Sequence, residues 1–142
     1  MRGPYNPAEF PFNDEILRAA SPEDPCRFVT LAGGVQIGKT VLGQIIVGGY
    51  LDESPCPMMY THPSDGNADL WVRTKLFPMI RNSPGLSECL GGKKAEGNQS
   101  LIERPDGQGM LRVATAGSVN DLSMYTAFVQ IQDDLAKWED LP

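Results

Sequence analysis

The chain has 142 residues, of which 41% are hydrophobic and 21% are charged. This length and composition suit one domain with a real core and exclude collagen-like and coiled-coil proteins. Fifteen glycines and twelve prolines predict many turns and short elements rather than a helical bundle. Eighteen acidic against twelve basic residues give a net charge of −6, so the chain as a whole repels nucleic-acid phosphates and any such contact must be local.

The cysteines and the histidine exclude several kinds of site. Cys26, Cys56 and Cys89 are odd in number and form no C-x-x-C pair, which argues against a disulfide framework and against a tetrahedral zinc site. A single histidine, His62, cannot supply a multi-histidine metal site. The sequence also has no apolar run of about 18 residues and no charged-then-apolar leader. We therefore expect a soluble protein of the reducing cytoplasm.

The first half of the chain predicts a helix, a strand and a second helix. Asn13 is a good N-cap for a short helix that runs to about residue 20, where prolines follow. Residues 27–32 are apolar and β-branched and lie between turn signals, which predicts a buried strand. Apolar residues then recur at helical spacing over residues 39–48, and two glycines end that helix. The resulting order is strand, glycine-rich turn, helix.

The second half continues the alternation of strands and helices. We expect a strand at 58–61, then a long amphipathic helix to about residue 80 that is capped by Ser64. Residues 84–109 are rich in glycine and irregular, with a hairpin that joins 101–103 to 110–111. A strand at 111–115, a helical turn at 118–123 and a last strand at 127–132 follow. This pattern predicts an α/β fold with a mostly parallel sheet, and the last strand leaves an open edge.

One motif carries specific chemistry. Residues 33–40 match the phosphate-binding pattern G-x-x-x-x-G-K-[ST] between a predicted strand and a predicted helix, and they read Gly33-Gly34-Val35-Gln36-Ile37-Gly38-Lys39-Thr40. Glycines let the backbone N–H groups wrap a phosphate, Lys39 reaches the β- and γ-phosphate oxygens, and the Thr40 hydroxyl ligates Mg²⁺. The alternative without a binding role is a glycine-rich turn from strand to helix with an exposed lysine.

A pair of acids ends the last predicted strand. Nucleotide hydrolysis needs a carboxylate at a strand end to hold the Mg²⁺ water shell and a further acid to orient the attacking water. Asp133 fits the first role and Asp134 the second. The alternative is that one of these acids caps the next helix, which begins at Leu135.

With these residues placed, the chain resembles the amino-terminal part of the ATPase domain of phage terminase large subunits of the lambda-like family. The landmarks cover nearly the whole chain in order: the Arg2-Gly3-Pro4-Tyr5 opening, Gln36-Ile37-Gly38-Lys39-Thr40, Tyr60-Thr61-His62-Pro63-Ser64, Leu76-Phe77-Pro78-Met79-Ile80-Arg81-Asn82-Ser83-Pro84, and Ala116-Gly117-Ser118-Val119-Asn120-Asp121-Leu122-Ser123. The last three are similar to the family's "hPT", "L-x-P-M-I-x-x-S-P" and "GA-x-S-P-x-x-L-x-S" segments.

The resemblance implies a three-layer P-loop NTPase fold, with residues 1–142 as a partial ATPase domain, incomplete at its carboxy-terminal end and without the nuclease domain. It makes residues 33–40 the Walker A loop and Asp133-Asp134 the Walker B pair, where the family usually has Asp-Glu. By analogy with the family's opening segment, Tyr5 stacks on adenine. A stabilising arginine comes from a neighbouring subunit.

The implied function is ATP hydrolysis with Mg²⁺ that drives double-stranded viral DNA into the prohead, in the cytoplasm of the host cell. The implied partners are the terminase small subunit, the portal and further copies of the chain. A truncated prophage remnant that binds nucleotide or a partner without turnover is the alternative. A small P-loop kinase for a metabolite is disfavoured, because no arginine-rich lid segment follows.

Several further residues carry weaker signals. His62 precedes a proline and is either a turn residue or a group near the nucleotide. The cations Arg73, Lys75 and Arg81 follow one helix, and Lys93-Lys94 lie on a glycine-rich loop. Each set is a candidate contact for DNA phosphates, although solvated surface charge is the more common role. Trp71 and Trp138 are expected to be packing residues.

Overall fold

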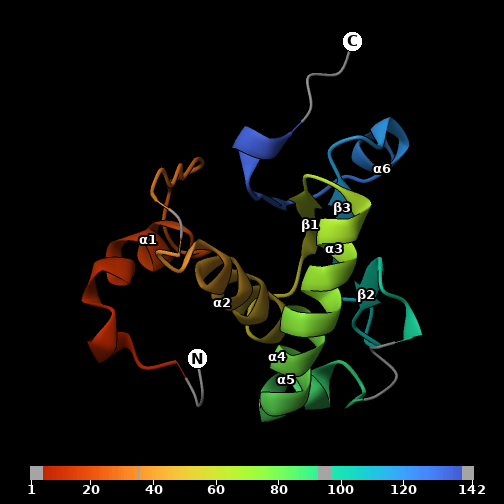
Figure 1. The fold of residues 1–142 in the computed structure, drawn as a ribbon. Helices are drawn as coiled ribbons and strands as arrows, with labels where there is room; N and C mark the ends of the chain where they lie inside the picture. Colours follow the sequence, from red (N-terminus) through yellow and green to blue (C-terminus); the bar gives the residue numbers. More distant parts are fainter. Residues whose placement is uncertain (1–4, 35, 93–96, 139–142) are drawn as a thin grey trace. The chain divides into compact units, whose positions relative to one another are not determined.

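The computed structural model describes residues 5–34, 36–92 and 97–138. The chain divides into two compact units, Met1–Ile46 and Val47–Pro142, and each is described by itself. Figure 1 shows the ribbon, with the first unit in red to gold and the second from gold to blue. In the described part of the chain, no helix is both long and apolar enough to cross a membrane.

The first unit consists of short helical turns and the start of a longer helix. The turns η1 (Pro7–Glu9) and η2 (Pro11–Asn13) lead into α1 (Asp14–Ala19), which confirms the first predicted helix. Asn13 occupies the N-cap position, but its side chain makes no capping hydrogen bond; its Nδ2 donates instead to the Tyr5 hydroxyl at 3.2 Å. The second predicted helix is α2 (Lys39–Asp52), which is a turn longer than expected.

The strand predicted at residues 27–32 is wrong. This segment has no regular secondary structure, and the Phe28 side chain is 90% exposed. A strand forms only when its backbone N–H and C=O groups pair with a neighbour. Within the described residues of the first unit no second strand is present to pair with it. The apolar, β-branched composition of this segment favours a strand, but among the described residues of its unit the segment has no neighbouring strand with which to form hydrogen bonds.

The second unit is built on a mixed, mostly parallel sheet of four strands, as predicted for an α/β fold. The strands are β1 (Pro57–His62), β2 (Leu101–Glu103), β3 (Met110–Thr115) and β4 (Val129–Gln132), in the spatial order β2-β3-β1-β4. β1 runs parallel to β3 and β4, while β2 and β3 form the predicted antiparallel hairpin. β4 pairs only with β1 among the described residues, which confirms the open edge at the last strand.

The long helix predicted after Ser64 is interrupted. Ser64 caps α3 (Asp65–Trp71) by accepting a hydrogen bond from the Asn67 N–H, as predicted. A π-helical segment, η3 (Val72–Leu76), then precedes α4 (Phe77–Asn82). Pro78 explains the change, because proline lacks an N–H and its ring clashes with the carbonyl four residues earlier. The helix widens ahead of it, and the Phe77 N–H donates to the Val72 carbonyl five residues back.

The core of the second unit lies between the sheet and these helices, and α3 packs on β1 and β3. The helical face predicted from spacing is confirmed at Trp71, Val72, Leu76 and Ile80, which are at most 5% exposed. Further short helices are α5 (Pro84–Cys89), α6 (Val119–Ser123) and η5 (Leu135–Lys137). The largest fully buried side chains are Leu51, Tyr60, Leu76, Ile80, Leu90, Ile102 and Leu111.

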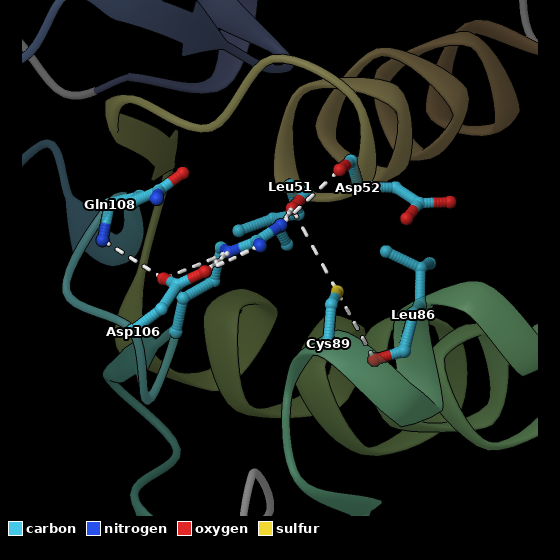
Figure 2. A network of polar contacts seen from close by, with 7 residues as sticks. Leu51, Asp52, Leu86, Cys89, Asp106 and Gln108 are labelled. Atoms are coloured by element: carbon cyan, nitrogen blue, oxygen red, sulfur yellow. Dashed lines mark hydrogen bonds and ion pairs between the residues drawn. The ribbon is translucent and has the colours of Figure 1, made fainter.

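A polar network ties the β2–β3 hairpin to the carboxyl end of α2 within this unit (Figure 2). The Arg104 guanidinium donates to the carbonyl oxygens of Leu51 at 2.5 Å and Asp52 at 3.2 Å. It also pairs with Asp106 at 2.6 Å. A cation at this position satisfies carbonyls that have no partner within the helix and complements the negative end of the helix dipole.

Candidate nucleotide-binding site

The loop 33–40 has the backbone geometry that its glycines predict. Gly38 has φ 86°, a conformation that side chains with a Cβ rarely adopt, and Gln36 also has a positive φ of 63°. A Cβ on Gly33 would collide with the Ile37 Cδ1 atom, whereas a Cβ on Gly34 would meet nothing within 4 Å. Val35 lies outside the described residues. The backbone therefore needs glycine at 38, whereas the exposed Ile37 side chain could move aside for a Cβ at 33.

Lys39 and Thr40 open the helix α2 directly after this turn. The Lys39 ammonium donates hydrogen bonds to the Gly33 carbonyl at 3.0 Å and to the Gly34 carbonyl at 2.7 Å, so the side chain folds back along the loop. The Leu42 N–H donates to the Gly38 carbonyl. The N–H groups of the preceding turn have no partner within the helix, and with the helix dipole they favour an anion.

An apolar cavity of about 510 Å³ adjoins the loop inside the first unit. Gln36, Ile37 and Gly38 line it on the loop side, and Tyr5 and Phe10 line it from the amino-terminal segment. The rings of Tyr5 and Phe10 stack with centroids 5.8 Å apart. Sites for small molecules commonly have volumes of about 300–1,000 Å³ and apolar, aromatic linings. The cavity is therefore large enough for a planar ring system beside the loop.

The acid pair lies at the carboxyl end of β4 in the second unit. The Asp133 N–H donates to the Thr61 carbonyl at 3.0 Å, and the Asp133 carboxylate accepts from the Tyr60 hydroxyl at 3.1 Å and from the Asp134 N–H at 2.9 Å. Asp134 has a left-handed backbone with φ 48°. Its carboxylate pairs with Lys137 at 2.7 Å and forms no capping hydrogen bond with η5. Asp134 thus occupies the N-cap position of η5, as the capping alternative predicts, but caps it through its backbone carbonyl and not through its side chain.

Three aromatic rings pack together at the carboxyl end of β1, next to Asp133. His62 stacks on Tyr60 with centroids 4.7 Å apart, and Trp71 lies 4.4 Å from Tyr60 and 5.0 Å from His62. Burial, together with Asp133, raises the pKa of the Tyr60 hydroxyl, which therefore stays protonated. Burial lowers the pKa of His62, although Asp133 and Asp134 oppose this shift. His62 is a neutral residue of β1 rather than a turn residue.

The chain matches, over residues 1–141, the family model described as "Phage terminase large subunit gpA, ATPase domain". It belongs to this family. No curated protein and no solved structure gives a significant match. The family match confirms the resemblance drawn from the motifs. It suggests ATPase activity, nucleotide use and a role in phage DNA packaging, and it implies DNA and packaging components as partners in general.

The terminase residues predicted from the sequence fall into two groups. Tyr5, Gln36, Ile37 and Gly38 line one cavity, with Lys39 and Thr40 at the adjoining helix start, in the first unit. Asp133 and Asp134 share one strand end in the second unit. The candidate DNA contacts Lys93-Lys94 and the landmark residues Arg2-Gly3-Pro4 lie outside the described residues. Arg73 and Arg81 contact carbonyls of their own helix at 3.4 Å.

Sequence reasoning missed three residues of this terminase domain that contact the predicted groups. Phe10 stacks on Tyr5, Lys137 pairs with Asp134, and Tyr60 donates to Asp133. The Lys137 contact has the helical i, i+3 spacing that the sequence displays. The Tyr60 contact depends on the pairing of β1 with β4, which no local pattern reveals. Trp138 donates its indole N–H to the Asp133 carbonyl at 3.0 Å, in keeping with a structural role.

Proposed function

We propose that this chain is the ATP-binding and ATP-hydrolysing part of a terminase motor that drives double-stranded DNA into a viral prohead. The observation that carries the proposal is the shape of the loop 33–40. Its positive φ angles at Gln36 and Gly38 turn the backbone immediately ahead of a helix, and Lys39 stands at the first position of that helix. Backbone amides, a helix amino terminus and one lysine are what a triphosphate requires.

The apolar cavity supports adenosine as the rest of the ligand. It begins at the loop residues and ends at the stacked rings of Tyr5 and Phe10. A nucleobase is planar and gains from an aromatic surface by offset stacking. We therefore assign Tyr5 to the base, while residues 33–40, including Val35, cradle the phosphates. Lys39 then exchanges the Gly33 and Gly34 carbonyls for phosphate oxygens, which are stronger, charged acceptors.

The donor atoms of the two predicted metal ligands fit Mg²⁺. Thr40 offers a hydroxyl oxygen and Asp133 a carboxylate oxygen, and hard oxygen ligands are the ones this ion prefers. Across the described residues no cluster of three or more His, Cys, Asp or Glu could hold a metal by itself. Mg²⁺ in nucleotide sites uses one or two protein ligands and takes the rest from phosphates and water. When bound, it neutralises charge that develops on the phosphoryl oxygens.

The remaining chemistry belongs to the chain's own groups. Lys39 and the loop amides hold the triphosphate in line and stabilise its charge. Asp134 orients the attacking water, for which its carboxylate must leave Lys137. An arginine from a neighbouring copy stabilises the transferring phosphoryl group. We further propose a three-layer P-loop NTPase fold for this domain. The small subunit and the portal are the proposed partners, and the host cytoplasm is the proposed location.

A second candidate function is nucleotide binding without turnover. The observation that favours it is the Lys137–Asp134 ion pair, which occupies the carboxylate assigned to the water. Asp134 is also one methylene shorter than the glutamate usual in the family. In this case residues 33–40 keep their role and phosphate release is absent.

The test is titration calorimetry of ATP in the presence of Mg²⁺, with phosphate release followed in the same samples. Lys39→Ala removes a charge-assisted contact worth about 1.5–3 kcal/mol and is expected to weaken binding roughly 10–100-fold. Arg18→Ala is the control, because it deletes an exposed cation of α1 in the same unit. Equal affinities of the wild-type chain and Lys39→Ala would refute the proposal. Binding without phosphate release would select the second candidate.

A further inference from the structure

Tyr60 on β1 contacts the acid at the end of the neighbouring strand. Its hydroxyl donates to the Asp133 Oδ2 atom at 3.1 Å. The strand register brings the two together: Tyr60 pairs with Ile131, Thr61 with Gln132, and the Asp133 N–H continues the ladder to the Thr61 carbonyl. The contact therefore follows from parallel pairing of the two strands.

The Tyr60 ring has no freedom to turn away. It is 1% exposed and packs against both the His62 ring and the Trp71 ring, with centroids 4.7 Å and 4.4 Å from its own. Leaving a buried hydroxyl without a hydrogen-bond partner costs free energy, so the Tyr60 hydroxyl stays directed at the Asp133 carboxylate. Asp133 is only half-buried and would otherwise choose among several rotamers.

The second oxygen of the same carboxylate is also engaged. The Asp134 N–H donates to Asp133 Oδ1 at 2.9 Å, and the Trp138 indole holds the Asp133 carbonyl at 3.0 Å. Each carboxylate oxygen can accept more than one hydrogen bond or ligand. One donor on each oxygen therefore fixes the orientation of the group and leaves lone pairs on both oxygens for a further ligand.

We propose that Tyr60 is a positioning residue, which orients the Asp133 carboxylate toward a divalent cation. This inference rests on the proposed function, since it assumes that Asp133 serves the metal. Groups that hydrogen-bond to metal ligands fix their orientation, and their loss typically weakens metal binding about 10–100-fold. Tyr60 does so without touching the cation or the substrate.

The experiment measures Mn²⁺ binding by electron paramagnetic resonance at a saturating concentration of a non-hydrolysable ATP analogue. Tyr60→Phe keeps the ring and deletes the hydroxyl, and it is expected to weaken Mn²⁺ binding at least tenfold. The affinity for the analogue without metal and the far-ultraviolet circular dichroism should stay unchanged. Tyr50→Phe is the matched control, because Tyr50 is a buried tyrosine of α2 in the same unit.

The variants Asp133→Asn and Lys39→Ala distinguish a failure of the Tyr60 inference from a failure of the proposed function. If Asp133→Asn weakens Mn²⁺ binding while Tyr60→Phe stays within twofold of the wild-type chain, the Tyr60 inference is overturned and the proposed function stands. If Asp133→Asn has no effect, the metal role of Asp133 is wrong, and the Tyr60 inference falls with it. If Lys39→Ala has no effect on the analogue, the proposed function itself fails.

A nuclear magnetic resonance measurement that keeps Tyr60 covers the case in which Tyr60→Phe does not fold. All tyrosine Cζ atoms are labelled with ¹³C, and the Tyr60 resonance is identified as the one that moves in Asp133→Asn, since Tyr60 donates to that carboxylate. The same resonance must move when Mg²⁺ and the ATP analogue are added to the unmutated chain. A resonance that moves in Asp133→Asn but stays in place when metal and nucleotide are added would overturn the inference.

Discussion

The two units of this chain differ in how they are held together. Among the described residues of the first unit, Leu42 is the one buried hydrophobic side chain, and the loop 33–40 is held mainly by backbone turns and the Lys39 hydrogen bonds. The second unit contains a paired sheet on which α3 packs, with seven large side chains under 2% exposed in addition to Val47 and Val72.

The difference shows that a phosphate-binding loop and a folded core place separate demands on a sequence. The loop needs glycine at position 38, where φ is 86°, and a lysine at the helix start, and both are local properties. The core needs side chains from distant segments to meet. The apolar segment 27–32 has the composition of a core strand, yet Phe28 stays 90% exposed, because composition alone supplies no partner.

The largest expected effect comes from truncating one apolar side chain in each unit. Leu111 on β3 is 0% exposed, so Leu111→Ala should lower the free energy of unfolding by about 2–5 kcal/mol. Phe28→Ala, at a side chain that is almost fully exposed, should change it by less than about 0.5 kcal/mol. Urea unfolding followed by fluorescence and circular dichroism measures both. A cost for Phe28→Ala as large as that for Leu111→Ala would mean that residues 27–32 are buried, and the contrast between the units would be lost.

An intermediate effect is expected from two alanine substitutions in the loop. Gly38→Ala places a Cβ at φ 86° and should cost about 1–2 kcal/mol of backbone strain, or roughly tenfold in ATP affinity. Gly34→Ala is the matched control, since its Cβ would meet nothing within 4 Å. Calorimetric titration with Mg²⁺ and ATP provides the comparison. Similar affinities for the two variants would show that the positive φ at Gly38 is not needed for binding.

The smallest effect concerns the pH dependence of the second unit. The Arg104 hydrogen bond, followed by the Gln108 N–H, holds the pKa of Asp106 below its usual range. A folded-state pKa below the unfolded value stabilises the fold at pH values above about 4 and stops doing so as the pH falls through the folded pKa. Asp106→Asn should therefore lower the thermal midpoint slightly at pH 7, and the difference should close as the pH falls through the folded-state pKa of Asp106.

The control for this measurement is Glu103→Gln, which removes an exposed acid of the same hairpin. Its midpoint should follow the wild-type curve across the range. If Asp106→Asn and Glu103→Gln behave alike at every pH, the Arg104 contact with Asp106 contributes nothing beyond general surface charge.

Local patterns predicted most of the elements correctly. The Ser64 cap, the helix α2, the hairpin of β2 and β3 and the positions of β1 and β4 each depend on a few neighbouring residues. Two errors have different causes. The strand at 27–32 failed because pairing is not a local property, and the break at η3 was missed because Pro78 changes the hydrogen bonding of the turn before it.

The sequence by itself determined the family of this protein, the loop with Lys39 and Thr40, and the acid pair that follows a strand. These features are fixed by the order of residues along the chain, since glycine geometry, helix starts and strand ends are read within a few positions. Only the tertiary structure decided that Tyr60 donates to Asp133 and that Tyr5 and Phe10 form one wall of a cavity. Such contacts require backbone pairing and side-chain packing across the fold, which cost conformational entropy and form only when the whole unit assembles.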